Sequence, residues 1–284
     1  MRYIVFNADD FGAGERTNEA IIHAHREGVL TSTSLMVNEP AADEAAALAR
    51  ETPSLAVGLH VVVSNGLATR PSAIAPDGRF MNDPAVAGFR AFFSRAARRA
   101  VELEVEGQFA RFAATGLGWS HVDGHQHLHM HPVVWDSVIR QCEAHGVRRI
   151  RIPYEEWMPF STGGLARRRI EWLFFRALRR RCLLTLGGRG FIAMDRVYGH
   201  LESGRMTREY LLAVLPRLGG RTNEVYFHPG TPHALPLASD PSIDVELHAL
   251  LDPSVRERIE SLGLCLTTFA GAEASIPAAG NLTT

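Results

Sequence analysis

Short apolar runs alternate with helical patterns along most of the chain, and this alternation restricts the possible fold more than any other feature. The apolar runs predicted to contain strands are 3–8, 29–38, 55–63, 119–122, 147–152, 224–227 and 264–268. The predicted helices are 15–28, 41–50, 85–115, 132–145, 163–186, 207–218 and 253–262. Strands joined by helices pair in parallel, so we expect an α/β fold that closes as an irregular (β/α) barrel.

The 284 residues show neither a linker nor an internal repeat, which favours one large domain. We assign residues 1–270 to this domain, with a helical insertion at about 163–186 and a flexible C-terminal tail at 271–284. The stretch 64–84 is rich in glycine and proline, and long loops of this kind often shape a substrate cleft.

Charge and composition disfavour several classes of protein. The net charge is −1 and the isoelectric point is about 6.9, so no nucleic-acid partner is indicated. The three cysteines are widely spaced, which is typical of a reducing compartment. No signal peptide is recognisable, and no uncharged apolar stretch reaches the roughly 18 residues of a membrane span. We therefore expect a cytoplasmic protein, and the sequence does not indicate its oligomeric state.

Polar side chains occupy the ends of several predicted strands. Asp9 and Asp10 follow the first strand, His60 lies in the third, and His228 follows the strand at 224–227. Individually, these residues could be a helix cap, a core histidine and a turn residue. The carboxyl ends of parallel strands share one face of a barrel, however, and active sites collect at that face.

A second polar feature is the histidine-rich segment 121–131, HVDGHQHLHMH, which follows the predicted strand at 119–122. It contains five of the 13 histidines of the chain: His121, His125, His127, His129 and His131. An extended segment would place His125, His127 and His129 on one face, whereas helical spacing would pair His121 with His125. The spacing alone does not select a metal ligand.

A carboxylate and two imidazoles at one barrel face suit a catalytic metal, because three protein ligands leave positions open for water and substrate. We expect one divalent ion, with zinc or magnesium favoured and manganese, cobalt or nickel also compatible with a mixed oxygen and nitrogen site.

The segment 163–186 is unusually rich in arginine and large apolar side chains. Between Leu165 and Arg181 it contains seven arginines and one glutamate. It predicts either a core helix with a solvated arginine face or an interfacial helix that contacts anionic headgroups and acyl chains. The segment FRAFFSRAARR at 89–99 has a similar composition.

Four motifs together resemble the YdjC-like carbohydrate deacetylases, which are relatives of the NodB-type polysaccharide deacetylases. These motifs are ADDFG at 8–12, GLH at 58–60, HVDGHQHLHMHP at 121–132 and FHPG at 227–230. They occur in the expected order, and the resemblance covers roughly residues 1 to 270. It implies a (β/α)-barrel hydrolase that removes an acetyl group from an N-acetylated sugar with the help of one divalent metal ion.

The resemblance also implies roles for individual residues. Asp10, His60 and His125 would bind the metal, Asp9 would be the general base, and His228 would be the general acid. Three further residues, Asp123, His127 and His129, are candidates for orienting His125. Arg151, at the end of the predicted strand 147–152, would orient Asp9 or bind the sugar.

Within the family, EPAA at 39–42, the segment at 89–99 and the arginine-rich insertion resemble the branch associated with hopanoid biosynthesis. That branch implies deacetylation of an N-acetylglucosaminyl group on bacteriohopanetetrol. Trp172, Phe174 and Phe175 would then contact the lipid, and the enzyme would associate with the inner face of the membrane.

Three alternatives remain open at this point. The first is a deacetylase of free chitooligosaccharides such as diacetylchitobiose. The second is another metal-dependent hydrolase, such as a phosphoesterase, which would use the HxH pairs. The third is a lipid-binding protein without catalytic activity.

Overall fold

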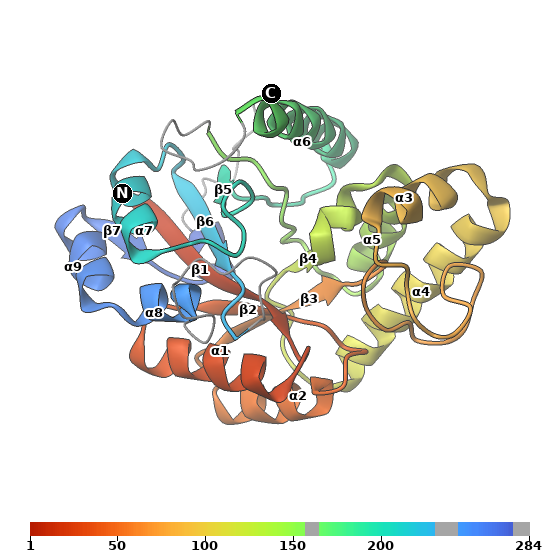
Figure 1. Ribbon diagram of the computed structural model, residues 1–284, viewed down its shortest axis with the longest axis horizontal. Coiled ribbons are helices and arrows are strands. Elements are labelled where there is room, and N and C mark those ends of the chain that lie inside the picture. The colour runs from red at the N-terminus through yellow and green to blue at the C-terminus, as the bar shows by residue number, and fades with distance from the viewer. Residues whose placement is uncertain (157–164, 231–243, 275–284) are drawn as a thin grey trace.

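The computed structural model describes residues 1–156, 165–230 and 244–274, without the side chains of 89–92 and 165–168. Seven strands form one all-parallel sheet. The strands are β1 (Arg2–Phe11), β2 (Ser32–Leu35), β3 (Ala56–Val61), β4 (Val122–Gly124), β5 (Arg196–Tyr198), β6 (Thr222–Phe227) and β7 (Leu264–Leu266). Their order is β4-β3-β2-β1-β6-β5, and β7 also pairs with β1. The predicted α/β class and irregular barrel are confirmed (Figure 1).

Helices surround the sheet. They are α1 (Glu15–Glu27), α2 (Ala42–Glu51), α3 (Pro84–Phe93), α4 (Arg95–Ala114), α5 (Pro132–Ala144), α6 (Leu165–Leu186), α7 (Arg208–Val214), α8 (Val245–Leu251), α9 (Pro253–Ser261) and α10 (Phe269–Glu273), with 3-10 helices η1 (His125–Met130) and η2 (Leu215–Arg217). No helix in the described part of the chain is long and apolar enough to cross a membrane.

The barrel is closed on one side by an irregular segment. The edge strands are β4 and β5, and the chain around Arg149–Tyr154 runs between them. Ile150 forms an isolated bridge to Val122 of β4, and Tyr154 forms another to Val197 of β5. The strand predicted at 147–152 is therefore wrong, because this segment pairs through single bridges rather than a continuous ladder.

Other boundaries also differ from the prediction. The helix predicted at 85–115 is two helices, because Ser94 adopts an extended conformation and caps α4 by accepting a hydrogen bond from Ala97 N. Neither β5 nor α8 was predicted. α10 lies partly within the predicted tail, yet Ala272 is buried and Arg149 pairs with Glu273.

The two faces of the strands have different surroundings. On β1, Ile4, Phe6 and Ala8 belong to the main core between the sheet and the helices. The alternate residue Val5 faces the barrel interior, where it packs with Tyr226 and with Phe269 of α10. Further along the same inner face are Asn7 and Asp9. The barrel interior is thus apolar at its amino end and polar toward the carboxyl ends of the strands.

Candidate active site

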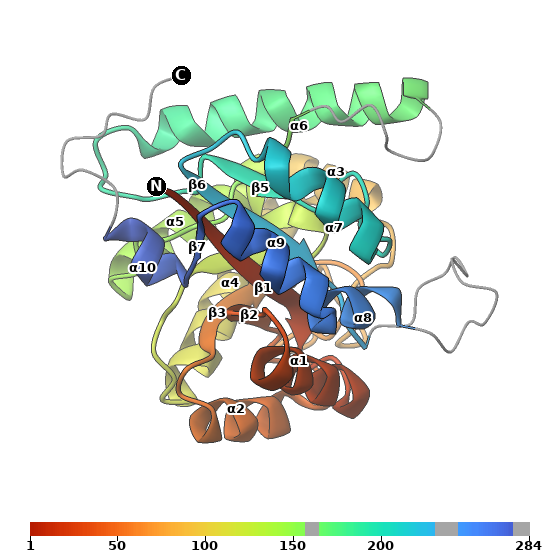
Figure 2. The ribbon, with the colours of Figure 1, turned by 90° about the vertical axis from the view of Figure 1, so that its left-hand side faces the viewer.

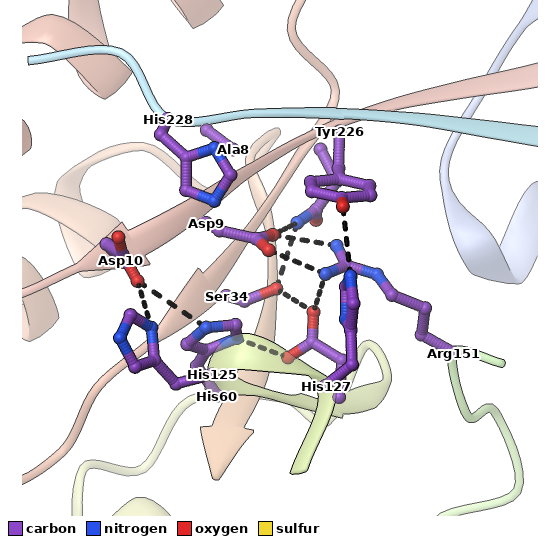
Figure 3. Close-up of polar contacts among 12 residues, drawn as sticks. Ala8, Asp9, Asp10, Ser34, His60, His125, His127, Arg151, Tyr226 and His228 are labelled. Atoms are coloured by element: carbon purple, nitrogen blue, oxygen red, sulfur yellow. Dashed lines mark hydrogen bonds and ion pairs between the residues drawn. The ribbon is translucent and has the colours of Figure 1, made fainter. Parts of the chain in front are cut away.

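The site begins at an irregularity in β1. Ala8 pairs with Thr33, whereas Phe11 pairs with Leu35, so β1 contains one residue more than β2 over this interval. Asp10, inside the bulge, has φ of 64°, which is uncommon for a residue other than glycine. A regular strand would direct Asp9 and Asp10 to opposite faces. The bulge instead lets both carboxylates contact residues of the same site (Figure 3).

Two histidines converge on Asp10. His125 Nδ1 lies 3.0 Å from Asp10 Oδ1, and His60 Nε2 lies 3.5 Å from the same oxygen. Each of these three residues offers a ligand atom within 4.8 Å of those of the other two. Asp10 and His60 are buried, while His125 is partly accessible. The structure therefore brings together the three residues predicted as metal ligands.

The donor set has the chemistry of a metal site. His60 Nδ1 lies 2.7 Å from Asp123 Oδ1, so a proton held there leaves Nε2 free to bind a cation. Burial alone would lower the pKa of His60, but Asp123, Asp9 and Asp10 outweigh it and raise this pKa to about 9. Burial likewise opposes ionisation of Asp10, yet His125, His228 and His60 lower its pKa. The site thus attracts positive charge, which a proton on His60 or a bound cation can supply.

We call Asp10, His60 and His125 the metal triad. Beside it, Arg151 is fully buried among three carboxylates, and we call these four residues the Arg151 cluster: Arg151, Asp9, Asp123 and Glu224. Arg151 donates to both oxygens of Asp9, at 2.7 and 2.8 Å. Its guanidinium also lies 2.7 Å from Asp123 Oδ2 and 2.6 Å from Glu224 Oε1. Of the two roles predicted for Arg151, the structure places it where it orients Asp9.

The pKa values of Arg151, Asp123 and Glu224 are shifted in different directions. Burial would lower the pKa of Arg151, but Asp123, Asp9 and Glu224 raise it well above its usual value. Burial would raise the pKa of Asp123, whereas Arg151 and His60 lower it. For Glu224, burial outweighs Arg151 and raises the pKa to about 7. Glu224 Oε2 is also buried without a hydrogen-bond partner among the described residues.

The histidines of the segment 121–131 contact different partners, because the backbone there is neither extended nor regularly helical. Gln126 and His127 have φ of 52° and 57°, and these left-handed residues turn successive histidines in different directions. His127 Nε2 contacts the Tyr226 hydroxyl at 2.9 Å, and His129 Nε2 contacts the carbonyl oxygen of Arg151 at 2.9 Å. Burial lowers the pKa of His129 to about 4, so this ring is neutral and donates.

None of the three residues predicted to orient His125 contacts it through a hydrogen bond that the structure records. Asp123 orients His60, while His127 and His129 face Tyr226 and Arg151. His121 lies deeper, where its ring stacks on Phe269 with centroids 3.8 Å apart. A Cβ on Gly58 would approach the His121 ring to 2.5 Å, so glycine at this position makes room for it.

His228 lies at the end of β6, across the site from His60 and His125 (Figure 3). Its backbone N–H donates to Glu246, whose carboxylate also lies 3.9 Å from His228 Nδ1. Glu246 belongs to α8, which the sequence did not reveal. Tyr226 and Glu224 were also missed, although polar residues at every second position of β6 lead to His228 and were a usable signal.

The lipid-contact residues predicted on α6 do not share one face. Phe174 is exposed, whereas Trp172 and Phe175 are half-buried. Trp172 Nε1 donates to the carbonyl oxygen of Glu155, and the Phe175 ring lies 5.6 Å from that of His127. α6 therefore packs over the irregular side of the barrel, with Phe175 close to the site.

A sequence profile described as YdjC-like protein matches residues 3–261. A carbohydrate deacetylase of Geobacillus stearothermophilus is 33% identical, and the match covers 94% of this chain and 97% of that protein. The chain belongs to the YdjC-like family. Among its relatives, a chitooligosaccharide deacetylase of Serratia marcescens is 31% identical, with 94% of this chain and 98% of that protein covered.

The YdjC-like chain also has a structural counterpart in an Enterococcus faecalis protein described as a cellobiose-phosphate cleavage protein. The two structures align with a TM-score of 0.70 at 21% identity, over 95% of this chain and 98% of the other. At this level of identity the likeness shows a shared fold.

Proposed function

We propose that this protein is a metal-dependent N-deacetylase that hydrolyses the acetamido group of an N-acetylated sugar. The observation that carries the proposal is the convergence of Asp10, His60 and His125 at the strand ends, directly beside Asp9. The names of the two relatives above, both deacetylases of carbohydrates, support the same reaction. The bulge in β1 is central, because it brings the proposed base next to a proposed ligand.

A divalent ion held by Asp10, His60 and His125 would polarise the amide carbonyl and make the attacking water more acidic. Asp9 accepts the proton from this water. Its two oxygens are held by Arg151, and Oδ1 also accepts from Asn7 Nδ2 at 2.9 Å, so its orientation is fixed before substrate arrives. His228 donates a proton to the amine nitrogen, which leaves as the free amine with acetate as the second product.

Acetate release from a chitooligosaccharide tests this proposal. Chelator-treated protein should be inactive, and adding zinc, magnesium, manganese, cobalt or nickel singly should identify the ion that restores activity. Asp9→Asn and His228→Gln should each reduce kcat by at least about 100-fold, because removal of a general acid or base typically costs 10²–10⁴-fold. Full activity of Asp9→Asn would eliminate Asp9 as the base.

For the finer substrate, we propose an N-acetylglucosaminyl group attached to a hopanoid such as bacteriohopanetetrol. The exposed apolar side chains on α6 support a substrate drawn from a membrane, and an enzyme of this kind would associate with the inner membrane face. A free chitooligosaccharide is the second candidate, and the Serratia marcescens relative favours it.

The two substrates can be compared directly. Mass spectrometry should detect the loss of one acetyl group from the lipid-linked sugar, and kcat/KM for this substrate should exceed that for diacetylchitobiose by at least tenfold. A higher kcat/KM for the free disaccharide would overturn the hopanoid assignment and leave the deacetylase proposal intact.

A further inference from the structure

Among the described side chains, α6 exposes more large apolar residues than any other helix around the barrel. Of the described residues, seven large hydrophobics are exposed, and four of them lie on α6. These are Ile170, Leu173, Phe174 and Leu184, with exposed fractions of 69%, 56%, 58% and 63%, and we call them the α6 patch. By contrast, α2 exposes mainly charged residues, including Asp43, Glu44 and Glu51. Clustered apolar side chains on a protein surface typically mark a site that binds another protein or a membrane.

The opposite face of α6 is already used by the barrel. Cys182 and Leu186 are buried in the main core, and Trp135 Nε1 donates to Thr185 Oγ1 at 2.7 Å. Phe175 contacts His127 and His200, with ring centroids 5.6 and 4.0 Å apart. Rotation of α6 to hide the patch would break these contacts. Figure 2 shows α6 as an outer layer of the molecule, with its long axis across one side.

Arginines accompany the patch. Arg169, Arg176 and Arg180 are exposed on the same helix. Glu171 is the only acid in the described side chains of α6, and it lies 3.4 Å from His200, on the barrel side. Two copies of this face would therefore bring arginine against arginine. An anionic lipid surface complements both components, because headgroups pair with the arginines and acyl chains accept the apolar side chains.

We propose that the α6 patch and its arginines form a docking surface for an anionic lipid bilayer. The docking surface itself does not depend on the proposed function. Only its purpose does, which is to bring the site to a sugar carried by a membrane lipid. Of the three residues that the sequence suggests for lipid contact, only Phe174 belongs to the α6 patch. On the inner side of the same helix, Phe175 contacts His127, so docking places the bilayer against the outer side of a helix that contacts the site.

Co-sedimentation with vesicles tests the surface. We expect the protein to bind vesicles of phosphatidylcholine that contain roughly 30 mol% of the anionic lipid phosphatidylglycerol. Binding to pure phosphatidylcholine should be at least tenfold weaker. Ile170→Ser/Leu173→Ser/Phe174→Ser should reduce binding at least tenfold. Arg176→Gln/Arg180→Gln should reduce it severalfold and remove most of its dependence on salt.

The matched control is Val86→Ser/Phe93→Ser, which removes two exposed hydrophobics of α3 and should leave binding unchanged. Wild-type protein that stays in the supernatant, or a triple variant that binds like wild type, would overturn the docking surface. Dimers in light scattering that the triple variant abolishes would instead assign the patch to a second copy of the chain.

Acetate release from a soluble chitooligosaccharide separates the two proposals. The triple variant should retain wild-type activity on this substrate, because its substituted residues face away from the site. A wild type that binds vesicles but releases acetate from neither the chitooligosaccharide nor the lipid-linked sugar would overturn the proposed function and leave the docking surface standing.

Discussion

The metal triad and the Arg151 cluster lie side by side in the barrel, but the negative charge of their carboxylates is balanced in different ways. Asp9, His60 and Asp123 satisfy the same spacing for metal ligands as Asp10, His60 and His125. In the Arg151 cluster, however, the guanidinium already supplies the positive charge. In the described part of the chain, the ion pairs recorded for Asp10 are with His60 and His125 rather than with an arginine, and the triad is partly accessible at His125. Ligand spacing therefore identifies two candidate sites, and the buried arginine shows which of them is available to a metal.

Removing a ligand of the triad should have the largest effect. Asp10→Asn and His125→Ala should each lower metal content to well under one ion per chain and reduce kcat to near background. Elemental analysis and acetate release would measure the two effects. His131→Ala is the matched control, because it removes another histidine of the same segment that is not among the candidate ligands. Stoichiometric metal in Asp10→Asn would assign the ion to other residues.

Removing Arg151 should chiefly affect stability. Arg151→Met leaves three buried carboxylates without their cation, and breaking a buried ion pair typically costs about 3–5 kcal/mol. Urea unfolding would measure the change. The control is Arg189→Met, which breaks a solvent-exposed pair with Glu143 and should cost far less. Equal losses in the two variants would contradict the central position given to Arg151.

The metal-free triad should make stability depend on pH through His60. The pKa of His60 is raised to about 9 in the folded protein, above the ordinary value of 6.5. This stabilisation is fully present below pH 6.5 and is lost as the pH rises through 9, up to about 3 kcal/mol for a shift of this size. The unfolding free energy of chelated protein should therefore fall between pH 6 and 9.5 by more than that of His60→Gln. Parallel pH profiles would show that His60 is neutral in the folded state.

Glu224 should give a pH effect on stability of similar size to that of His60, over a lower pH range. Its pKa is raised to about 7 from 4.5, so its contribution favours the folded protein below pH 4.5 and is lost as the pH rises through 7. Glu224→Gln keeps an acceptor for Arg151 and has no carboxylate to ionise. Relative to wild type, the variant should gain up to about 3 kcal/mol as the pH rises from 4.5 to 7, measured by urea unfolding. A difference independent of pH would mean that Glu224 stays ionised beside Arg151.

Much of the candidate site could be predicted from residues at strand ends. Parallel strands place their carboxyl ends on one face, so Asp10, His60 and His228 could be assigned to the same region without a structure. The histidine-rich segment resisted this approach, because selection of His125 depends on left-handed conformations at Gln126 and His127. Histidine adopts this conformation more often than most residues, but glutamine does not, so no local sequence rule indicates two left-handed residues in succession here.

The partners of these residues could be predicted only in part. Arg151 was identified as a residue that could orient Asp9, and the structure shows the contact. Asp123 was expected to support His125 but binds His60, since that pairing depends on the register of β3 and β4. Glu246 was missed because it lies on α8 and reaches the end of β6 from a segment distant in the sequence.

The sequence by itself determined the parallel α/β architecture, the family and the chemical types of side chain gathered at the strand ends. These follow from local periodicity and from motifs whose residues are close in the chain. The tertiary structure decided which histidine faces Asp10, which carboxylates share Arg151, and which face of α6 remains in water. Each of these depends on backbone turns of one or two residues and on contacts between distant segments, and neither leaves a periodic signal in the sequence.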